Sequence, residues 1–370
     1  MRYRIEKDSL GEKVIPAEAY YGINSLRSKE TFEITKHGLC RQNIKAFANI
    51  KKAQAKTNYE FGLLDKKKAE KIALSCDEII NGRLHGQFVT DSIQDGYGFG
   101  MNINACEVIT NRANEMFGGD KGQYNYVSLE DVDLNQDLDE VVTLSGKITA
   151  IRLIKKLIAE GKKLVNAYEY FVEKNETLNK DLKEQLISFS RLLEKDIKRL
   201  DKSMDNLLEI NYGKKLNIAG PTVKEEYLKK FIKNLNSCVT DKFVLAKNEY
   251  DSSRSLDSFM TVSSCMKNMI VNLSKSASDL KQMIINGEIN LPTLQNLGMK
   301  DEKTIVLDMI KQISFYIIGN DITISRCVED GELEKNIFKP MIFACLFESA
   351  NLVRRTIRTI REKVVETLEV

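Results

Sequence analysis

The chain has 370 residues, of which 42% are hydrophobic, so it can bury a sizeable core in two or three structural regions. Lysine and arginine together number 56, aspartate and glutamate 53, and the formal net charge is only +3, with the two signs interleaved along the chain. Because nucleic-acid-binding proteins gather positive charge into a patch or tail, we expect no nucleic-acid partner.

The sequence contains no apolar run that approaches the roughly 18 residues of a membrane-spanning helix. The N-terminal segment MRYRIEKDSL is too charged for a secretory signal, so we expect a cytoplasmic protein without a membrane partner. Seven cysteines lie far apart with no Cys-x-x-Cys pair, which indicates reduced, structural cysteines. His37 and His85 are the only histidines, too few for a histidine triad or a zinc site, and we expect neither a metal nor a cofactor.

Only four prolines occur, so the stretches between them can form long helices. In chain order, short strands are predicted near residues 3–5 and 32–34, and the remaining predicted elements are helical. We predict an all-α fold with a small mixed N-terminal domain, residues 1–125, and a central domain of long bundled helices, residues 126–370. The predicted helices are 44–61, 66–81, 103–116, 148–173, 182–207, 225–236, 256–284, 304–318 and 340–369.

Two of these helices carry a continuous apolar stripe with steps of three or four residues. One stripe runs through residues 186–207 and the other through residues 256–284, with charged or small residues between. We expect the two helices to pack together. Because the stripe of a long bundle helix is wider than one neighbour covers, we also expect a homo-oligomer.

Four separated segments carry a resemblance to a known family. They read RIEKDSLGEKVIPAEAYYG, GYGFGMNINACEVITNRANEMFGG, GEINLPTLQ and IIGNDITISRCVEDGELEKNIFKPMI. In the same order, they follow the family patterns Glu-x-Asp-x-Leu-Gly, Gly-x-Gly-Thr-Ser-x-Asn-Met-Asn-x-Asn-Glu-Val, Glu-Ile-x-Leu-Pro-x-Leu-Gln and Ile-Gly-Asn-Asp. The chain thus resembles the aspartase/class II fumarase (fumarate lyase) superfamily over residues 4–365, and its pattern is closest to that of the aspartate ammonia-lyases.

The resemblance implies a fumarate lyase-like central helical bundle, a homotetramer and active sites assembled from three subunits. It also implies elimination of ammonia, water or an amine from a small dicarboxylate, through a carbanion that needs a base and fixed donors for the charged carboxylate. Relatives carry a small C-terminal helical domain beyond the counterpart of residues 361–363. We expect this domain to be absent here, since the sequence stops at Val370.

The family's catalytic serine loop, Gly-Ser-Ser-x-Met-Pro-x-Lys-x-Asn, falls on residues 294–304 of this sequence. Both serines, the proline and the asparagine are missing there, and the segment resembles the start of a helix rather than a mobile lid. Lys303 or Lys300 stands for the loop lysine. As two open alternatives, Lys303 binds a carboxylate or is simply a solvated charge.

A second family segment contributes substrate-binding groups at the start of a helix. Its Thr-Ser pair falls on Phe99 and Gly100, so two hydroxyls are lost, whereas Asn102, Asn104 and Glu107 keep their places. These three residues form either a remnant substrate-binding shelf or local hydrogen bonds and a helix cap within the fold.

The third segment, residues 131–144, keeps Gln136 as a remnant binding residue but carries acids at 137, 139 and 140, where the family has Ser, Asn and Asp. Added acids would repel a dicarboxylate. A further family block has no room in the short join at residues 175–182. Near the N-terminus, Arg27 either binds a carboxylate, as the resemblance implies, or pairs with an acid.

These losses lead to three hypotheses. The first is a catalytically degenerate homologue that serves as an oligomeric scaffold or partner subunit. The alternative is a lyase with a rearranged site that still acts on aspartate or a related dicarboxylate, with Lys303, Asp301 or Glu302 as the base. In the third, the protein inserts into tetramers of an active aspartase homologue and regulates them.

Overall fold

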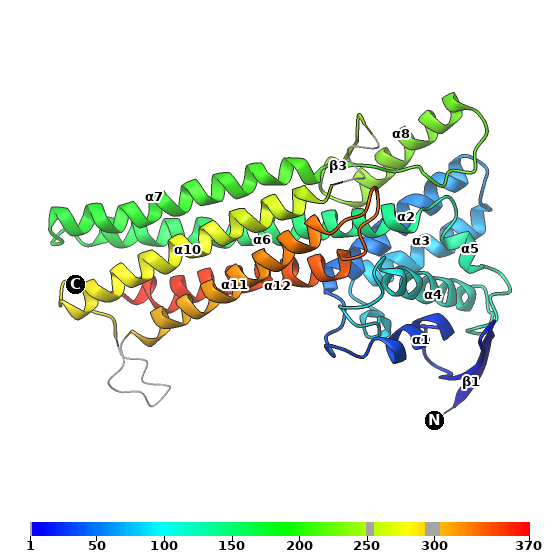
Figure 1. Ribbon diagram of the computed structural model, residues 1–370, viewed down its shortest axis with the longest axis horizontal. Helices are drawn as coiled ribbons and strands as arrows, with labels where there is room; N and C mark the ends of the chain where they lie inside the picture. The colour runs from blue at the N-terminus through cyan, green and yellow to red at the C-terminus, as the bar shows by residue number, and fades with distance from the viewer. Residues whose placement is uncertain (1, 249–254, 293–303) are drawn as a thin grey trace. The chain divides into compact units, whose positions relative to one another are not determined.

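The computed structural model describes residues 2–248, 255–292 and 304–370, and in this part of the chain helices predominate, beside four short strands (Figure 1). The all-α prediction is confirmed. By spatial contacts the chain divides into two compact units. The first comprises Met1–Thr149, Leu207–Ser255 and Cys327–Ala344, and the second comprises Ala150–Asn206, Leu256–Arg326 and Cys345–Val370. The sequence division at residues 125 and 126 stays a prediction.

The first unit begins with an antiparallel hairpin of β1 (Tyr3–Asp8) and β2 (Gly11–Pro16). Gly11 closes the turn with a φ of +116°, a conformation that favours glycine. The strand predicted at residues 32–34 is wrong, because these residues follow α1 (Ile23–Thr31), whose last turn Phe32 closes by donating its N–H to the Ser28 carbonyl.

Four longer helices and one short one complete most of the first unit. Asp65 caps one of them by accepting the N–H groups of Lys67 and Lys68, as an N-cap aspartate does. Their bounds lie within a few residues of the predictions, apart from the short helix, which was not predicted. They are α2 (Arg41–Glu60), α3 (Lys66–Ile80), α4 (Phe99–Met116), α5 (Leu129–Val132) and α8 (Pro221–Cys238).

The second unit consists of long helices that lie along one another (Figure 1). Three of them, α6, α11 and α12, have one end in the first unit, so the two units share continuous elements. A parallel pair of short strands, β3 (Glu209–Ile210) and β4 (Val244–Leu245), belongs to the first unit. The long helices are α6 (Leu138–Lys174), α7 (Lys180–Ser203), α10 (Asp257–Ile285), α11 (Ile305–Glu329) and α12 (Lys339–Lys363).

The two predicted apolar stripes meet where α7 packs against α10, which confirms that prediction. A polar contact fixes their register: the Asn272 side chain donates to both oxygens of the buried Asp196, at 2.9 and 3.1 Å. Most of the remaining seam is apolar, and close packing of such side chains stabilises a bundle. Its buried members include Leu186, Leu193, Ile197, Leu200, Val262, Met266, Met269 and Leu273.

Among the described helices, none is long and apolar enough to cross a membrane.

Candidate functional site

The start of α4 lies where the resemblance places a Thr-Ser pair. The N–H groups of Phe99 and Gly100 donate to the Asp95 carboxylate, at 2.7 and 2.9 Å. Asp95 thus provides acceptors for N–H groups at the start of the helix, which have no partner within the helix. A Cβ added at Gly100 would lie only 2.3 Å from both Ser28 Oγ and Gln94 Oε1. A serine at position 100 would therefore require the side chains of Ser28 and Gln94 to move.

Two residues of the predicted shelf make structural hydrogen bonds. The Asn104 side chain accepts the N–H of Val89 at 2.8 Å and donates to the carbonyl of Gln87 at 3.0 Å. The buried Glu107 carboxylate accepts the N–H groups of residues 22, 24 and 25, at 2.7–3.1 Å. Burial raises the pKa of Glu107 despite these donors. The contacts favour local hydrogen bonding over substrate binding at both positions.

Asn102 lies in a buried cluster with two charged residues. The fully buried ammonium of Lys51 lies 2.5 Å from Asp133 Oδ1, and Asn102 Nδ2 donates to the same oxygen at 3.3 Å. Burial works to lower the pKa of Lys51, but the nearby Asp133 and Cys106 raise it overall. Burial also raises the pKa of the Cys106 thiol to about 12, so this cysteine stays protonated.

Asn102 and Gln136 share an unusual feature. Asn102 Oδ1 is buried without a hydrogen-bond partner in the described part of the chain, and so is Gln136 Oε1. Gln136 uses only its amide nitrogen, which donates to the Val132 carbonyl at 2.8 Å. Because a buried acceptor without a donor is costly, each amide oxygen is a place where a ligand or a water molecule would be stabilised.

The acids that precede and open α6 are held by residues far away in sequence. Asp139 forms a salt bridge with Lys339, whose side chain is 2% exposed. Burial lowers the pKa of Lys339, while Asp139 opposes this shift. Asp137 accepts the N–H of Asp139 at 3.0 Å and so caps the helix.

Glu140 is the most strongly buried of these acids. Its carboxylate accepts the N–H of Gly213 at 2.9 Å and that of Lys214 at 3.1 Å. Burial raises the pKa of Glu140 to about 7, although the two N–H donors favour the charged form. The side chain fastens the 213–214 backbone to the first turn of α6.

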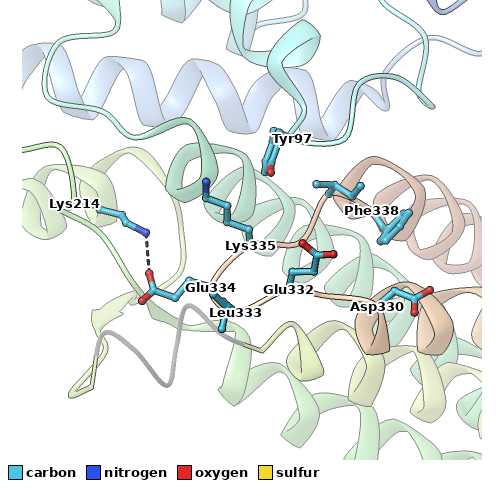
Figure 2. Close-up of a pocket in the computed structure, with 9 residues that line it drawn as sticks. Tyr97, Lys214, Asp330, Glu332, Leu333, Glu334, Lys335 and Phe338 are labelled. Atoms are coloured by element: carbon cyan, nitrogen blue, oxygen red, sulfur yellow. Dashed lines mark hydrogen bonds and ion pairs between the residues drawn. The ribbon is translucent and has the colours of Figure 1, made fainter.

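A cavity of about 590 Å³ lies in the first unit and is drawn in Figure 2. One edge is fixed by Lys214, whose ammonium lies 2.9 Å from Glu334 Oε2. At another edge, a Cβ added at Gly96 would lie 2.6 Å from the Cβ of Ile337 and 2.9 Å from its carbonyl oxygen, so the two chain segments touch. The lining residues are Tyr97, Lys214, Asp330, Glu332, Leu333, Glu334, Lys335, Ile337 and Phe338.

Arg27 pairs with an acid, one of its two predicted roles. Its Nε lies 2.6 Å from Asp8 Oδ2, and its Nη2 lies 2.8 Å from Asp8 Oδ1. Binding of a carboxylate by Arg27 stays a prediction. Lys303, with residues 294–302 of the segment aligned with the family's serine loop, lies outside the described residues, and the next described helix, α11, begins at Ile305.

The sequence interpretation missed the lysines that bind these acids. Lys51 lies in α2 between buried Ile50 and Ala53. A lysine on such an apolar helix face could have indicated a buried cation that needs an acidic partner. Lys214, whose backbone N–H donates to Glu140, lies 74 residues from it, and Lys339 lies 200 residues from Asp139. No local pattern links them to these acids.

Comparisons with known proteins agree with this architecture. A family model described as Lyase matches residues 11–178 and 181–297. The chain is 33% identical to an aspartate ammonia-lyase of Bacillus subtilis, over 99% of this chain and 82% of that protein. Among solved structures, a fumarate lyase:delta crystallin from Brucella melitensis is 28% identical, with a TM-score of 0.92 over 100% of this chain and 89% of the other. A class II fumarase from Schistosoma mansoni, 20% identical, shares the fold with a TM-score of 0.89 over 100% and 85%.

Proposed function

The chain belongs to the lyase family of aspartate ammonia-lyases and class II fumarases, and on this premise we propose that it has lost the family's elimination reaction. It acts instead as an oligomeric scaffold or partner subunit. The observation that carries the proposal is the state of residues 131–144, where Asp137 and Asp139 stand in place of a Ser and an Asn of the family pattern and are bound to groups of the protein itself.

The contacts of these acids explain why a dicarboxylate is disfavoured. The Lys339 ammonium is already neutralised by Asp139, and the N–H groups of residues 213 and 214 are already bound to Glu140. The segment therefore offers no free donor in these contacts and adds negative charge. Like charges at short range repel strongly where water is excluded.

The missing base has a comparable effect. No serine occurs in residues 294–304, and losing a general base typically costs about 10²–10⁴-fold in rate. Each lost oxyanion donor costs about 10²–10³-fold. These losses do not add simply, because residues of one site act as a unit. The combined loss still removes most of the rate of a lyase.

An exposed apolar surface on α11 supports self-association. Phe315 is 69% exposed and Ile322 is 59% exposed, and because they are seven residues apart they lie on the same helix face. Large apolar side chains that share one surface often mark a subunit contact. We propose a homotetramer, in line with the family resemblance. Mixed tetramers with an active aspartase homologue would use the same face.

A second candidate function is a lyase with a rearranged site for a small dicarboxylate. The unpartnered amide oxygens of Asn102 and Gln136 favour it, as does the pKa of Glu140 near 7, which suits a group that exchanges protons at neutral pH. Its base would be Lys303, Asp301 or Glu302.

Light scattering on the purified protein, combined with an ultraviolet assay for fumarate, tests the proposal. We expect a tetramer that forms no fumarate from L-aspartate or L-malate, with the Bacillus subtilis aspartate ammonia-lyase as positive control. The variant Ile322→Asp should reduce the mass of the oligomer, whereas Leu74→Asp, at an exposed site on α3, should not. A monomeric wild type, or fumarate formation near the rate of the control, would refute the proposal.

A further inference from the structure

Hydrogen bonds fix the 330–338 segment, which forms one wall of the cavity drawn in Figure 2. The backbones of Glu332 and Lys335 exchange two hydrogen bonds, at 2.8 and 2.9 Å, which close the turn between them. Asn336 donates to the Cys327 carbonyl at 2.8 Å and accepts the N–H of Phe338 at 2.8 Å. These bonds fix the 330–338 segment.

Three charges on this segment are available to a ligand. Within the described ranges, Lys335, Glu332 and Asp330 form no ion pair, whereas Lys214 is neutralised by Glu334. Lys335 and Glu332 both extend from the segment toward the side on which Tyr97 lies (Figure 2). A ligand in the cavity would therefore meet one free cation and at least one free anion.

The wider surroundings are acidic. The hydrogen bond to Glu334 raises the pKa of Lys214, and the negative charges of Asp137 and Asp139 add to this shift. The other nearby cation, Lys339, is occupied by Asp139. The field at the cavity thus opposes a ligand with two negative charges and favours one that carries an ammonium group.

The rest of the lining is apolar or aromatic. Leu333, Ile337 and Phe338 contribute hydrocarbon surface, and the ring of Tyr97 can attract a cation through its π face. A cavity of about 590 Å³ lies within the range that holds small ligands. The lining thus suits a ligand with a short hydrocarbon side chain next to one positively and one negatively charged group.

We propose that this cavity binds a small α-amino acid with an apolar side chain, in its zwitterionic form. The ligand's ammonium faces Glu332 and the ring of Tyr97, its carboxylate faces Lys335, and its side chain lies against Ile337 and Phe338. This site goes beyond the proposed function, because binding there requires no elimination and no association between subunits.

Isothermal titration calorimetry with L-leucine as the probe tests the proposal on the full chain. Two half-ligands separate the charges: 3-methylbutylamine lacks the carboxylate, and 4-methylpentanoate lacks the ammonium. We expect each to bind at least about tenfold more weakly than L-leucine, since a hydrogen bond to a charged group contributes about that factor or more. Fumarate, a dianion, should bind more weakly still.

Two variants locate the site. Glu332→Gln and Lys335→Gln should each weaken L-leucine binding about tenfold. Glu70→Gln and Lys66→Gln make the same chemical changes at exposed positions of α3 and should leave it unchanged. Circular dichroism would verify that all four variants fold as the wild type does.

Three results would overturn the proposal: no binding of L-leucine at about 10 mM, tighter binding of fumarate than of L-leucine, or equal L-leucine affinity in cavity and control variants. The fumarate assay of the proposed function is independent of this titration. A protein that binds L-leucine yet forms fumarate would retain this site and refute only the loss of elimination.

Discussion

The seam between α7 and α10 and the acidic segment at residues 131–144 follow different rules. The seam is stabilised by apolar side chains whose helical spacing is visible in the sequence. Each helix contributes an apolar face, and such a face can pack against any other helix face of similar shape and polarity. The acidic segment is stabilised by charged and polar partners, Lys339 and the 213–214 backbone, that come from distant parts of the chain. The first region sets the fold, while the second lies at the candidate site and carries its acids.

This difference bears on the proposed loss of elimination. A seam tolerates exchange among apolar residues of similar volume, because burial is not directional. A buried ion pair tolerates little, because removing one partner strands the other charge. The Asp139–Lys339 pair therefore holds the site in its present state, and a single substitution toward the family's neutral residue would destabilise the protein.

The largest expected effect is at that pair. Asp139→Asn places the family's residue at position 139 but leaves the buried Lys339 ammonium unpaired, and it should lower the free energy of unfolding by about 4 kcal/mol. Chemical denaturation monitored by circular dichroism measures the change.

The double variant Asp139→Asn/Lys339→Met is the control, since it removes both charges and should recover most of the lost stability. If the single variant is as stable as the wild type, the pair does not hold the segment.

A somewhat smaller effect is expected at the seam. Leu193→Ala removes a side chain that is 2% exposed and leaves a cavity, which should cost about 3 kcal/mol. Leu193→Met nearly conserves volume and should cost about 1 kcal/mol. Equal losses in the two variants, measured by urea denaturation, would contradict the packing described for α7 and α10.

Glu140 should give a pH-dependent effect. Its pKa in the folded protein is about 7, above the ordinary 4.5, so the folded state holds the proton more tightly than the unfolded state does. The contribution of Glu140 to stability is thus fully present below pH 4.5 and is lost as the pH rises to about 7.

The variant Glu140→Gln should remove this decline, so that it is more stable than the wild type at pH 8, by about 2 kcal/mol, and similar to it at pH 4. Urea titrations of both proteins at several pH values measure the difference. Parallel stability curves for wild type and variant would show that Glu140 does not titrate in this window.

Much of the fold could be predicted from the sequence, because helix periodicity and caps are local. The nine predicted helices correspond to described helices, but α1 and the short α5 were not predicted; residues 23–31 of α1 combine a short length with only three buried positions. The predicted strand at 32–34 failed for the same reason, since an alternation over three residues carries little information.

The candidate site was less predictable. The motifs located Asn102 and Gln136, and both have a buried amide oxygen without a partner in the described part of the chain. They did not show that Asn104 is held by Val89 and Gln87, nor that Lys339 neutralises Asp139. Such partners depend on tertiary structure, which one sequence does not encode in any local pattern.

We propose that this lyase fold no longer eliminates ammonia from aspartate. The most direct measurement is fumarate formed per subunit from saturating L-aspartate over a day, in parallel with the Bacillus subtilis aspartate ammonia-lyase. We expect less than one fumarate per subunit, while the control turns over many times. Repeated turnover by this protein, lost on heat denaturation, would contradict it.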